Sequence, residues 1–305
     1  MQKLIGAPPN PLSKLQLQTI EQWKAVVAAA AAATTIGALP GLCERRGVRF
    51  EKTSIAGVRA FIVTPREIPA ANQNRLLIHL HGGCYVLSPG EAGLGEAVLM
   101  AGFGRFKVIS VDYRMPPEAF FPAALDDGLA VWNASVKTAD ARKMAVFGTS
   151  AGGALTLALV ARARAEGLPL PAAIASGTPM SDTTKTGDTF YTNEGLDNVL
   201  VSRDGFCDAA TRLYANGADL ADPRLSPVYE DFSGYPPTIL TSGTRDLLLS
   251  NTVRVHRKLR QSGVEADLHV YEGQAHAHYL FNDAAPETAE AFGEIAAFFD
   301  KHLER

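Results

Sequence analysis

Residues 147–153 read F-G-T-S-A-G-G and place Ser150 in a G-x-S-x-G pattern. A short apolar run at 144–147 precedes the serine, and a run rich in small residues at 151–165 follows it. A nucleophilic serine on a sharp turn between a strand and a helix adopts a strained backbone geometry, so the residues two before and two after it must be glycine. The pattern therefore predicts a strand, a turn and a helix that present Ser150 as a candidate nucleophile.

The composition is that of an ordinary globular protein. The 305 residues are 47% hydrophobic and 20% charged, which suits one large α/β domain with a sizeable core or two smaller domains. The net charge of −3 shows no excess of basic residues that would attract a polyanion, so nucleic acid is not an expected partner.

The chain has three cysteines, Cys43, Cys84 and Cys207, which are far apart and form no C-x-x-C pattern. An odd number at this spacing argues against a disulfide scaffold and against a thiolate zinc site. It suits a reducing compartment, and we expect a cytoplasmic protein.

The uncharged, alanine-rich span 25–43 raises the question of a targeting segment. A signal peptide has its apolar region nearer the start, and alanine, threonine and glycine contribute little transfer free energy compared with leucine. We expect a soluble helix here and no stable membrane insertion.

Short apolar runs alternate with helical stretches along most of the chain. Strands are predicted at 48–55, 58–64, 75–80, 107–111, 144–147, 172–176, 238–242 and 267–271. Helices are predicted at 92–104, 122–135, 151–165, 252–261 and 286–303, with one or two more within 12–33 that end near Gly37 and Pro40. The first two strands flank an Ala-Gly turn and form an antiparallel hairpin, whereas the later alternation predicts a mostly parallel sheet covered on both faces.

One long segment between the strands 172–176 and 238–242 interrupts this alternation. It holds a polar stretch at 181–193, a predicted helix at 202–214 and a proline-marked exit. A long excursion inside an α/β frame is usually a functional lid. We therefore predict N-terminal cap helices at 1–45, a catalytic core at 46–180 and 226–305, and a cap insertion at 181–225.

A serine nucleophile also needs a base and an acid. The base takes the hydroxyl proton, and a carboxylate holds the tautomer of the base and stabilises the imidazolium. In a fold of this kind the acid and then the histidine follow the serine, each at the carboxyl end of a late strand. Asp246 follows the strand 238–242 and His276 follows the strand 267–271. Asp246 is the candidate acid, with a helix N-cap as its alternative role, and His276 is the candidate base, with His278 as its competitor.

Acyl transfer further requires donors for the developing oxyanion, each worth about 3 to 4 kcal/mol when deleted. One donor is expected on Ala151, directly after the nucleophile, and others on a glycine-rich loop after an early strand. The run L-I-H-L-H-G-G-C-Y at 77–85 supplies Gly82, Gly83 and Cys84. These four residues form the candidate oxyanion hole, although a flexible turn is the alternative interpretation of the two glycines.

This ordered set of motifs resembles the bacterial hormone-sensitive-lipase-like (family IV) carboxylesterases of the α/β-hydrolase superfamily. The matching segments are H-G-G at 81–83, D-Y-R at 112–114, P-E at 117–118, F-P-A-A at 121–124, D-D at 126–127, the elbow at 148–153, D-P at 222–223, S-P at 226–227, G-x-x-D at 243–246 and the histidine loop at 272–276. The resemblance covers nearly all of the chain from about residue 48 onward.

The resemblance implies an α/β-hydrolase fold with a helical cap made by the N-terminal helices and the excursion at 181–222. It implies that Gly83, Cys84 and Ala151 donate to the oxyanion, and it favours His276 over His278. We expect no cofactor.

The chain departs from the family pattern at two positions. Cys84 stands where the family has a third glycine, and its backbone N–H can still donate while its side chain crowds the acyl site or stiffens the loop. Cys84 as an alternative nucleophile lacks an activating base. Thr149 stands where many relatives have aspartate, and this G-T-S-A-G-G sequence points to a sub-branch of which some members act on lactones.

Two other classes of function, a metallohydrolase and a non-catalytic receptor, are alternatives to a serine hydrolase. A metallohydrolase is suggested by two pairs of histidines, His79 with His81 and His276 with His278. No cluster of acidic ligands at suitable spacing accompanies these pairs, so we expect no metal. A non-catalytic small-molecule receptor is the other rival, because plant hormone receptors resemble this family but have lost the triad histidine, which is present here.

We therefore expect a serine esterase for short to medium acyl esters that works through an acyl-enzyme, with lactone hydrolysis by the same triad as the alternative. Tyr85, Phe190 and Tyr191, near the predicted cap, are candidate substrate contacts, with packing as their alternative role. The expected partner is a small ester or lactone, and the sequence leaves a homodimer open.

Overall fold

An eight-stranded sheet forms the centre of the computed structural model, which describes residues 8–15, 17–32 and 38–304. Its strands are β1 (Val48–Ile55), β2 (Val58–Pro65), β3 (Leu76–Leu80), β4 (Lys107–Val111), β5 (Met144–Thr149), β6 (Ala173–Gly177), β7 (Thr238–Gly243) and β8 (Ala266–Tyr271). Their order across the sheet is β1-β2-β4-β3-β5-β6-β7-β8. The hairpin of β1 and β2 is antiparallel, β2 pairs antiparallel with β4, and all other pairs are parallel. The predicted mostly parallel, eight-stranded sheet is confirmed.

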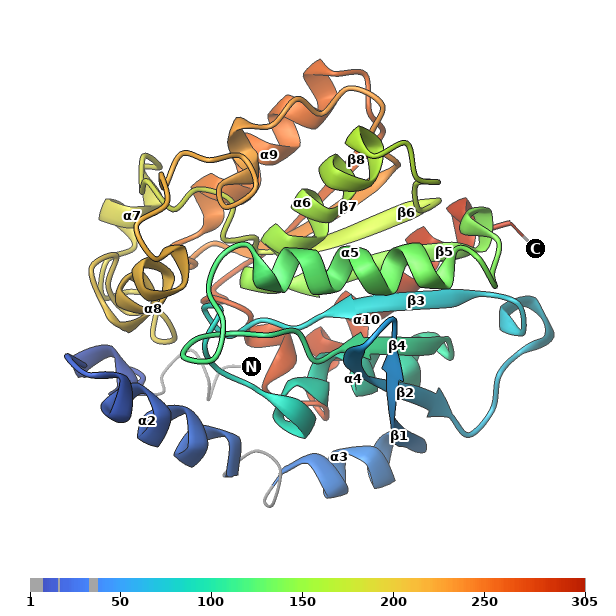
Figure 1. The fold of residues 1–305 in the computed structure, drawn as a ribbon, viewed down its shortest axis with the longest axis horizontal. Coiled ribbons are helices and arrows are strands. Elements are labelled where there is room, and N and C mark those ends of the chain that lie inside the picture. Colours follow the sequence, from blue (N-terminus) through green and yellow to red (C-terminus); the bar gives the residue numbers. More distant parts are fainter. Residues whose placement is uncertain (1–7, 16, 33–37, 305) are drawn as a thin grey trace.

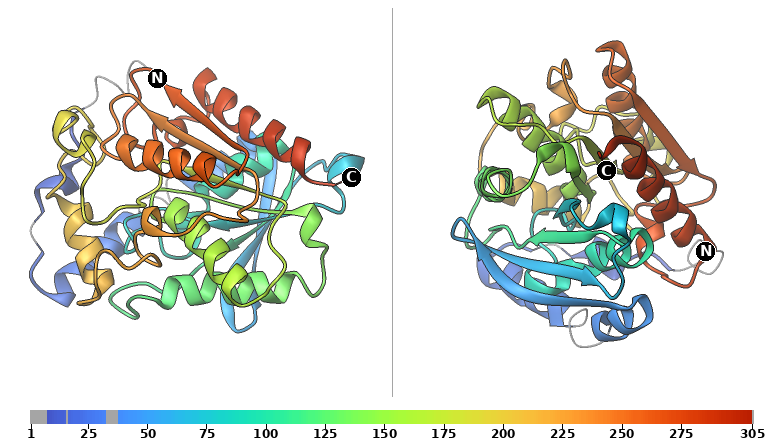
Figure 2. Two further views of the ribbon diagram at one scale, coloured as in Figure 1. Left: turned by 90° about the horizontal axis from the view of Figure 1, so that it is seen from above. Right: turned by 90° about the vertical axis from the view of Figure 1, so that its right-hand side faces the viewer.

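Helices cover both faces of the sheet, as Figures 1 and 2 show. They are α2 (Ile20–Ala32), α3 (Leu39–Arg46), α4 (Gly95–Gly104), α5 (Ala123–Ser135), α6 (Ala151–Ala165), α7 (Thr189–Thr192), α8 (Phe206–Ala215), α9 (Leu249–Gln261) and α10 (Pro286–His302). The buried side chains of α5, α6 and α9 belong to the core on one face, and those of α3, α4 and α10 belong to the core on the other. This two-sided cover is the arrangement expected of a parallel sheet.

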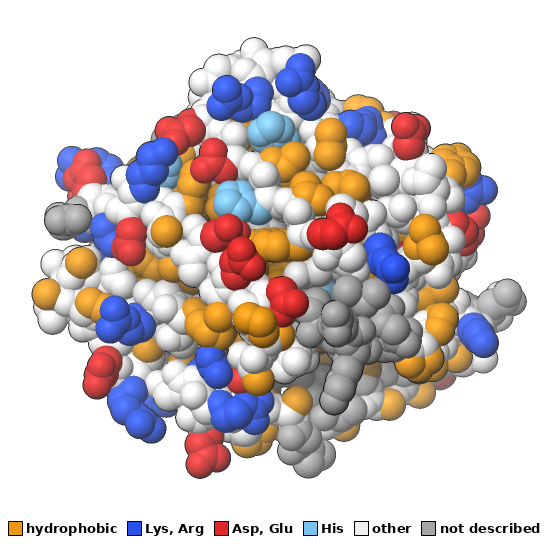
Figure 3. All heavy atoms as spheres, turned by 180° about the vertical axis from the view of Figure 1, so that it is seen from behind, with side chains coloured by type: hydrophobic (Ala, Val, Ile, Leu, Met, Phe, Trp, Pro, Cys, Tyr) orange, Lys and Arg blue, Asp and Glu red, His pale blue; other side chains and the backbone are white. Residues whose placement is uncertain are grey.

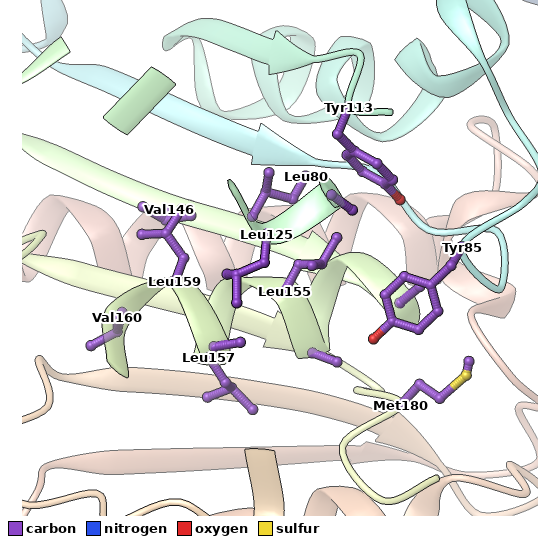
Figure 4. Close-up of a cluster of buried hydrophobic side chains, with 14 of the residues drawn as sticks. Leu80, Tyr85, Tyr113, Leu125, Val146, Leu155, Leu157, Leu159, Val160 and Met180 are labelled. Carbon is purple, nitrogen blue, oxygen red and sulfur yellow. The ribbon is translucent and has the colours of Figure 1, made fainter. Parts of the chain in front are cut away.

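The central strands feed both cores because successive side chains point to opposite faces. Leu80 of β3 and Val146 of β5 pack against Leu125 and Leu155 on α5 and α6 (Figure 4). Phe147 points the other way, toward the core of α4 and α10. Burial on both faces is the physical reason why these strands are continuous apolar runs in the sequence.

The N-terminal region differs from its prediction. The helical stretch 12–33 is a 3-10 turn, Pro11–Lys14, followed by α2, and the predicted ends at Ala33 and Gly37 lie outside the described residues. The helix α3 is an addition to the predicted elements, because the sequence pattern predicts a helix end near Pro40. Pro40 lies in the first turn of α3, where its missing N–H needs no partner. Gly47 ends this helix with a φ of 63°.

Helices α2, α7 and α8 lie at one end of the molecule (Figure 1). Trp23 of α2 packs on Phe206 of α8, with ring centroids 5.3 Å apart. The N-terminal helix and the long segment between β6 and β7 therefore meet, although they are far apart in sequence.

The outer surface carries mixed charges. On the face seen in Figure 3, acidic, basic and hydrophobic side chains are interspersed. Within the described ranges, no helix has both the length and the apolar character required to cross a bilayer.

Candidate active site

Ser150 lies at the turn between β5 and α6 with φ 63° and ψ −120°, a strained conformation for a residue other than glycine. Its N–H donates to the carbonyl of Gly177, 2.9 Å away. A Cβ on Gly148 would lie 2.2 Å from the carbonyl oxygen of Leu80, and one on Gly152 would lie 1.9 Å from the same atom. Only glycine allows the elbow to pack this closely against the end of β3.

Asp246 and His276, which follow β7 and β8, form a buried pair. The Nδ1 atom of His276 lies 3.1 Å from Oδ1 of Asp246. The same carboxylate accepts the N–H of Leu248 at 2.7 Å and the hydroxyl of Ser242 at 3.1 Å, and Thr178 donates to it as well. These donors fix the orientation of the carboxylate.

The pKa of His276 results from opposing effects. Burial lowers it, but the neighbouring carboxylate of Asp246, assisted by that of Asp197, outweighs burial and raises the pKa above the ordinary value of 6.5. The site therefore stabilises the imidazolium that forms when the histidine accepts a proton.

His278 has a different environment. Its Nδ1 accepts the N–H of Ala275 at 3.2 Å, so Nε2 carries the proton, and Nε2 lies 2.9 Å from Oδ1 of Asn198. Burial lowers the pKa of His278 to about 4. Both ring nitrogens are engaged, and the ring stays neutral at physiological pH.

Ser150 and His276 line one cavity of about 500 Å³, together with Gly82, Gly83 and Cys84. This volume is within the range of small-molecule sites. Much of the remaining wall is apolar and comes from the N-terminal helices, the segment between β6 and β7, and the loop after His276; it includes Leu39, Leu42, Val199, Leu200, Phe206, Leu280 and Phe281.

The loop after β3 has the backbone geometry of a tight cradle. Gly83 has φ 118° and Cys84 has φ 53°, and the carbonyl of Gly83 accepts the N–H groups of Val86 and Leu87. The N–H groups of Gly83 and Cys84 donate to no acceptor in the part of the chain that the structure describes. Ala151, as the first residue of α6, likewise has no intrahelical acceptor. These are the donors an oxyanion would use.

Cys84 forms a disulfide with Cys207 of α8, with the two Cα atoms 5.3 Å apart. The expectation of no disulfide was wrong, because the partners are 123 residues apart in sequence and meet only in the folded chain. Cys43 is a free thiol, which accounts for the odd number. The disulfide ties the loop after β3 to α8, and both half-cystines line the cavity.

We expect Cys207→Ser to lower the free energy of unfolding by about 2 to 4 kcal/mol, the usual cost of losing a native disulfide. Cys84 is left in place, so that the loop keeps its side chain. Urea unfolding of the oxidised protein measures the change, and Cys43→Ser is the matched control that loses only a free thiol. Equal stability of the two variants would contradict the expectation.

The structure also shows a buried polar network at Thr149, the residue before Ser150, which no sequence pattern predicts. The hydroxyl of Thr149 donates to Oε1 of Glu96 at 2.6 Å and lies 2.7 Å from the hydroxyl of Tyr279. The other oxygen of Glu96 lies 3.1 Å from Nε2 of His79. A carboxylate from α4 thus contacts the residue directly before Ser150.

The three aromatic candidates for substrate contact lie outside the cavity that holds Ser150. Tyr85 is buried and stacks on Tyr214, with ring centroids 4.4 Å apart. Phe190 is buried within the segment after β6, and Tyr191 is 62% exposed with Arg203 over its ring. The apolar residues that line the cavity instead carry no local signal in the sequence.

Comparison with known proteins gives consistent matches. The family model described as alpha/beta hydrolase fold matches residues 77–280. The crystal structure of esterase E25 is similar with a TM-score of 0.94 and 45% identity, covering 98% of this chain and 91% of that chain. An esterase from the bacterial hormone-sensitive lipase family has a TM-score of 0.80 and 27% identity, covering 95% and 100%. Carboxylesterase NlhH of Mycobacterium tuberculosis is 30% identical over 240 residues, which are 75% of this chain and 74% of that protein.

The matched region includes the elbow at Ser150, the loop after β3 and the loops that carry Asp246 and His276. The similar proteins carry the names of esterases and carboxylesterases. The chain belongs to the alpha/beta hydrolase fold family, among the bacterial hormone-sensitive-lipase-like carboxylesterases.

Proposed function

We propose that this protein is a serine carboxylesterase that hydrolyses short to medium acyl esters through an acyl-enzyme. The observation that carries the proposal is that Ser150 and His276 line the same apolar cavity as Gly83 and Cys84, while Asp246 holds Nδ1 of His276. With Nδ1 engaged, Nε2 of the imidazole is the atom available as base.

In the proposed reaction, Oγ of Ser150 attacks the acyl carbonyl and its proton passes to Nε2 of His276. The N–H groups of Gly83, Cys84 and Ala151 stabilise the oxyanion, with Gly82 shaping the loop. Collapse of the tetrahedral intermediate breaks the ester bond, and His276 returns the proton to the leaving alcohol. Water then attacks the acyl-enzyme with the same proton transfers, which releases the acid and restores Ser150.

The cavity supports the substrate class. A volume of about 500 Å³ with a largely apolar wall suits a small ester better than a long-chain triglyceride. In the proposed organisation, residues 1–45 and 181–225 form the cap and residues 46–180 and 226–305 form the core. A lactone reaches the same serine by the same chemistry, and the G-T-S-A-G-G sequence keeps that substrate as the alternative.

The proposal is tested with p-nitrophenyl acetate, butyrate and palmitate and with γ-butyrolactone. We expect kcat/KM for butyrate to exceed that for palmitate by at least about tenfold, since poor fit of the longer chain raises the transition-state free energy by at least about 1.4 kcal/mol. Phenylmethylsulfonyl fluoride, which loses fluoride when a serine attacks it, should add its sulfonyl group to the tryptic peptide 144–162, detected by mass spectrometry.

Other outcomes of this assay point elsewhere. Faster turnover of the lactone than of any ester indicates a lactone hydrolase. Absence of turnover and of labelling, with retained binding of a small ligand, indicates a non-catalytic receptor. A homodimer remains a prediction. Light scattering tests it by measuring the molar mass of the protein in solution.

The predicted cytoplasmic location can be tested by counting the free thiols of the protein in cells. Disulfides are rare in a reducing cytosol, so Cys84 and Cys207 would be free thiols there, together with Cys43. Trapping thiols during cell lysis and counting the modified cysteines therefore distinguishes three free thiols from one. A single free thiol would contradict the cytoplasmic prediction.

A further inference from the structure

The segment 193–200, between α7 and α8, contacts the loop that carries the proposed catalytic acid. The side-chain amide of Asn193 donates to the carbonyl of Asp246 at 2.9 Å and to that of Thr244 at 3.2 Å. Asn198 contacts His278 on the neighbouring histidine loop. The segment therefore joins both late-strand loops of the site to the proposed cap.

Asp197 is the central residue of this contact and is fully buried. Its Oδ2 accepts the N–H of Leu247, the residue directly after Asp246, at 2.9 Å. Its Oδ1 accepts the N–H groups of Val199 and Leu200 at 2.9 and 3.1 Å. Both oxygens accept from N–H donors, as an ionised carboxylate does.

The backbone around Asp246 is thus held from both sides. Asn193 holds the carbonyl of Asp246, and Asp197 holds the next N–H along the chain. The side chain of Asp246 can then keep its 3.1 Å contact with Nδ1 of His276. Asp197 does not line the cavity, although Val199 and Leu200 do, so it acts through Asp246 and not on the substrate.

Asp197 also contributes charge. Burial and the charge of Asp246 raise the pKa of Asp197, and the charge of Asp197 in turn helps to raise the pKa of His276. The titratable groups that act on His276 are Asp246 on the acid loop, Asp197 on the segment 193–200 and His278 on the histidine's own loop.

We propose that Asp197 is a positioning residue for the catalytic acid: from the cap insertion it fixes the backbone that follows Asp246 and places a second carboxylate behind the pair of Asp246 and His276. This inference rests on the proposed function. It makes the cap insertion a part of the catalytic machinery as well as a cover for the cavity.

The test is Asp197→Asn. Asparagine keeps the shape but accepts on one oxygen only, so either the N–H of Leu247 or those of Val199 and Leu200 lose their acceptor. We expect kcat for p-nitrophenyl butyrate to fall about 10- to 100-fold, the usual effect of removing a group that orients a site residue, with KM within about threefold. The lost negative charge destabilises the imidazolium, so the acidic limb of the kcat/KM profile should move to lower pH by about half a unit or more.

Asp182→Asn is the matched control. Asp182 is also a buried aspartate of the proposed cap insertion, but its carboxylate bonds Thr184, Thr186 and Arg254. Its replacement removes a buried charge of the same kind and should leave the acidic limb in place. A structural loss alone would affect both variants in the same way, whereas the pH shift is expected only for Asp197→Asn.

A second variant, Asn193→Ala, removes the donors to Asp246 and Thr244 without changing any charge. We expect kcat to fall about 10-fold or more with KM nearly unchanged. Wild-type kcat and an unmoved acidic limb in folded Asp197→Asn would overturn the proposal. If that variant does not fold, unchanged kcat in Asn193→Ala overturns it. Failure of the proposed function would give a different result from failure of the proposal about Asp197, because the wild-type protein would then turn over no ester.

Discussion

Ser150→Ala is expected to lower kcat for p-nitrophenyl butyrate by at least about 10⁴-fold, since loss of the nucleophile in a serine hydrolase costs on the order of 10⁶ in kcat. Only the oxyanion donors and the substrate cavity remain in this variant, and they give a small residual rate. Alanine keeps a Cβ, so the backbone at φ 63° experiences the same strain as with serine. The loss should therefore be chemical and should leave the fold intact.

The measurement compares kcat, melting temperature and phenylmethylsulfonyl fluoride labelling of the variant with those of wild type. Ser181→Ala is a matched control, because Ser181 is a fully buried serine whose hydroxyl bonds the carbonyl of Asn251 and does not line the cavity. The control should retain activity and labelling. Undiminished turnover by Ser150→Ala would remove Ser150 from the role of nucleophile.

Elements with a strong local pattern could be predicted closely from the sequence. The bounds predicted for β1, β4 and α6 coincide with those observed. Each of these two strands is either buried on both faces or alternates between buried and exposed residues, and both patterns show in its composition. The helix α6 begins directly after the elbow, so the turn residues mark its start. The placement of Asp246 and His276 after late strands could be predicted for the same reason, because strand ends in a parallel sheet converge at one edge.

Features that depend on contacts between distant segments could not be predicted. Cys84 meets Cys207 only because α8 lies over the loop after β3. Glu96 and Asp197 lie in segments that show no catalytic pattern, and each reaches the site from a separate element. Residue type and position in the sequence are also insufficient to identify a substrate contact. Tyr85 is an aromatic residue near the predicted cap, yet its ring points into the core, as Figure 4 shows.

His276→Ala and His278→Ala are expected to differ by several orders of magnitude in kcat. His276 is held by Asp246 and has a raised pKa, whereas both nitrogens of His278 are engaged and its pKa is lowered to about 4. We expect a loss of at least about 10⁴-fold for His276→Ala. For His278→Ala we expect a loss below about tenfold, together with destabilisation of about 1 to 3 kcal/mol from the unpaired N–H of Ala275.

The pH profile of the wild type separates the two histidines independently of any variant. A base must be neutral to accept the serine proton, so kcat/KM should rise as the pH rises through the pKa of the base. For His276 that rise lies above 6.5, because its pKa is raised, and for His278 it would lie near 4. An acidic limb near pH 4, or a larger loss of kcat in His278→Ala measured well below its melting temperature, would assign the base to His278 and leave the pair of Asp246 and His276 without its proposed role.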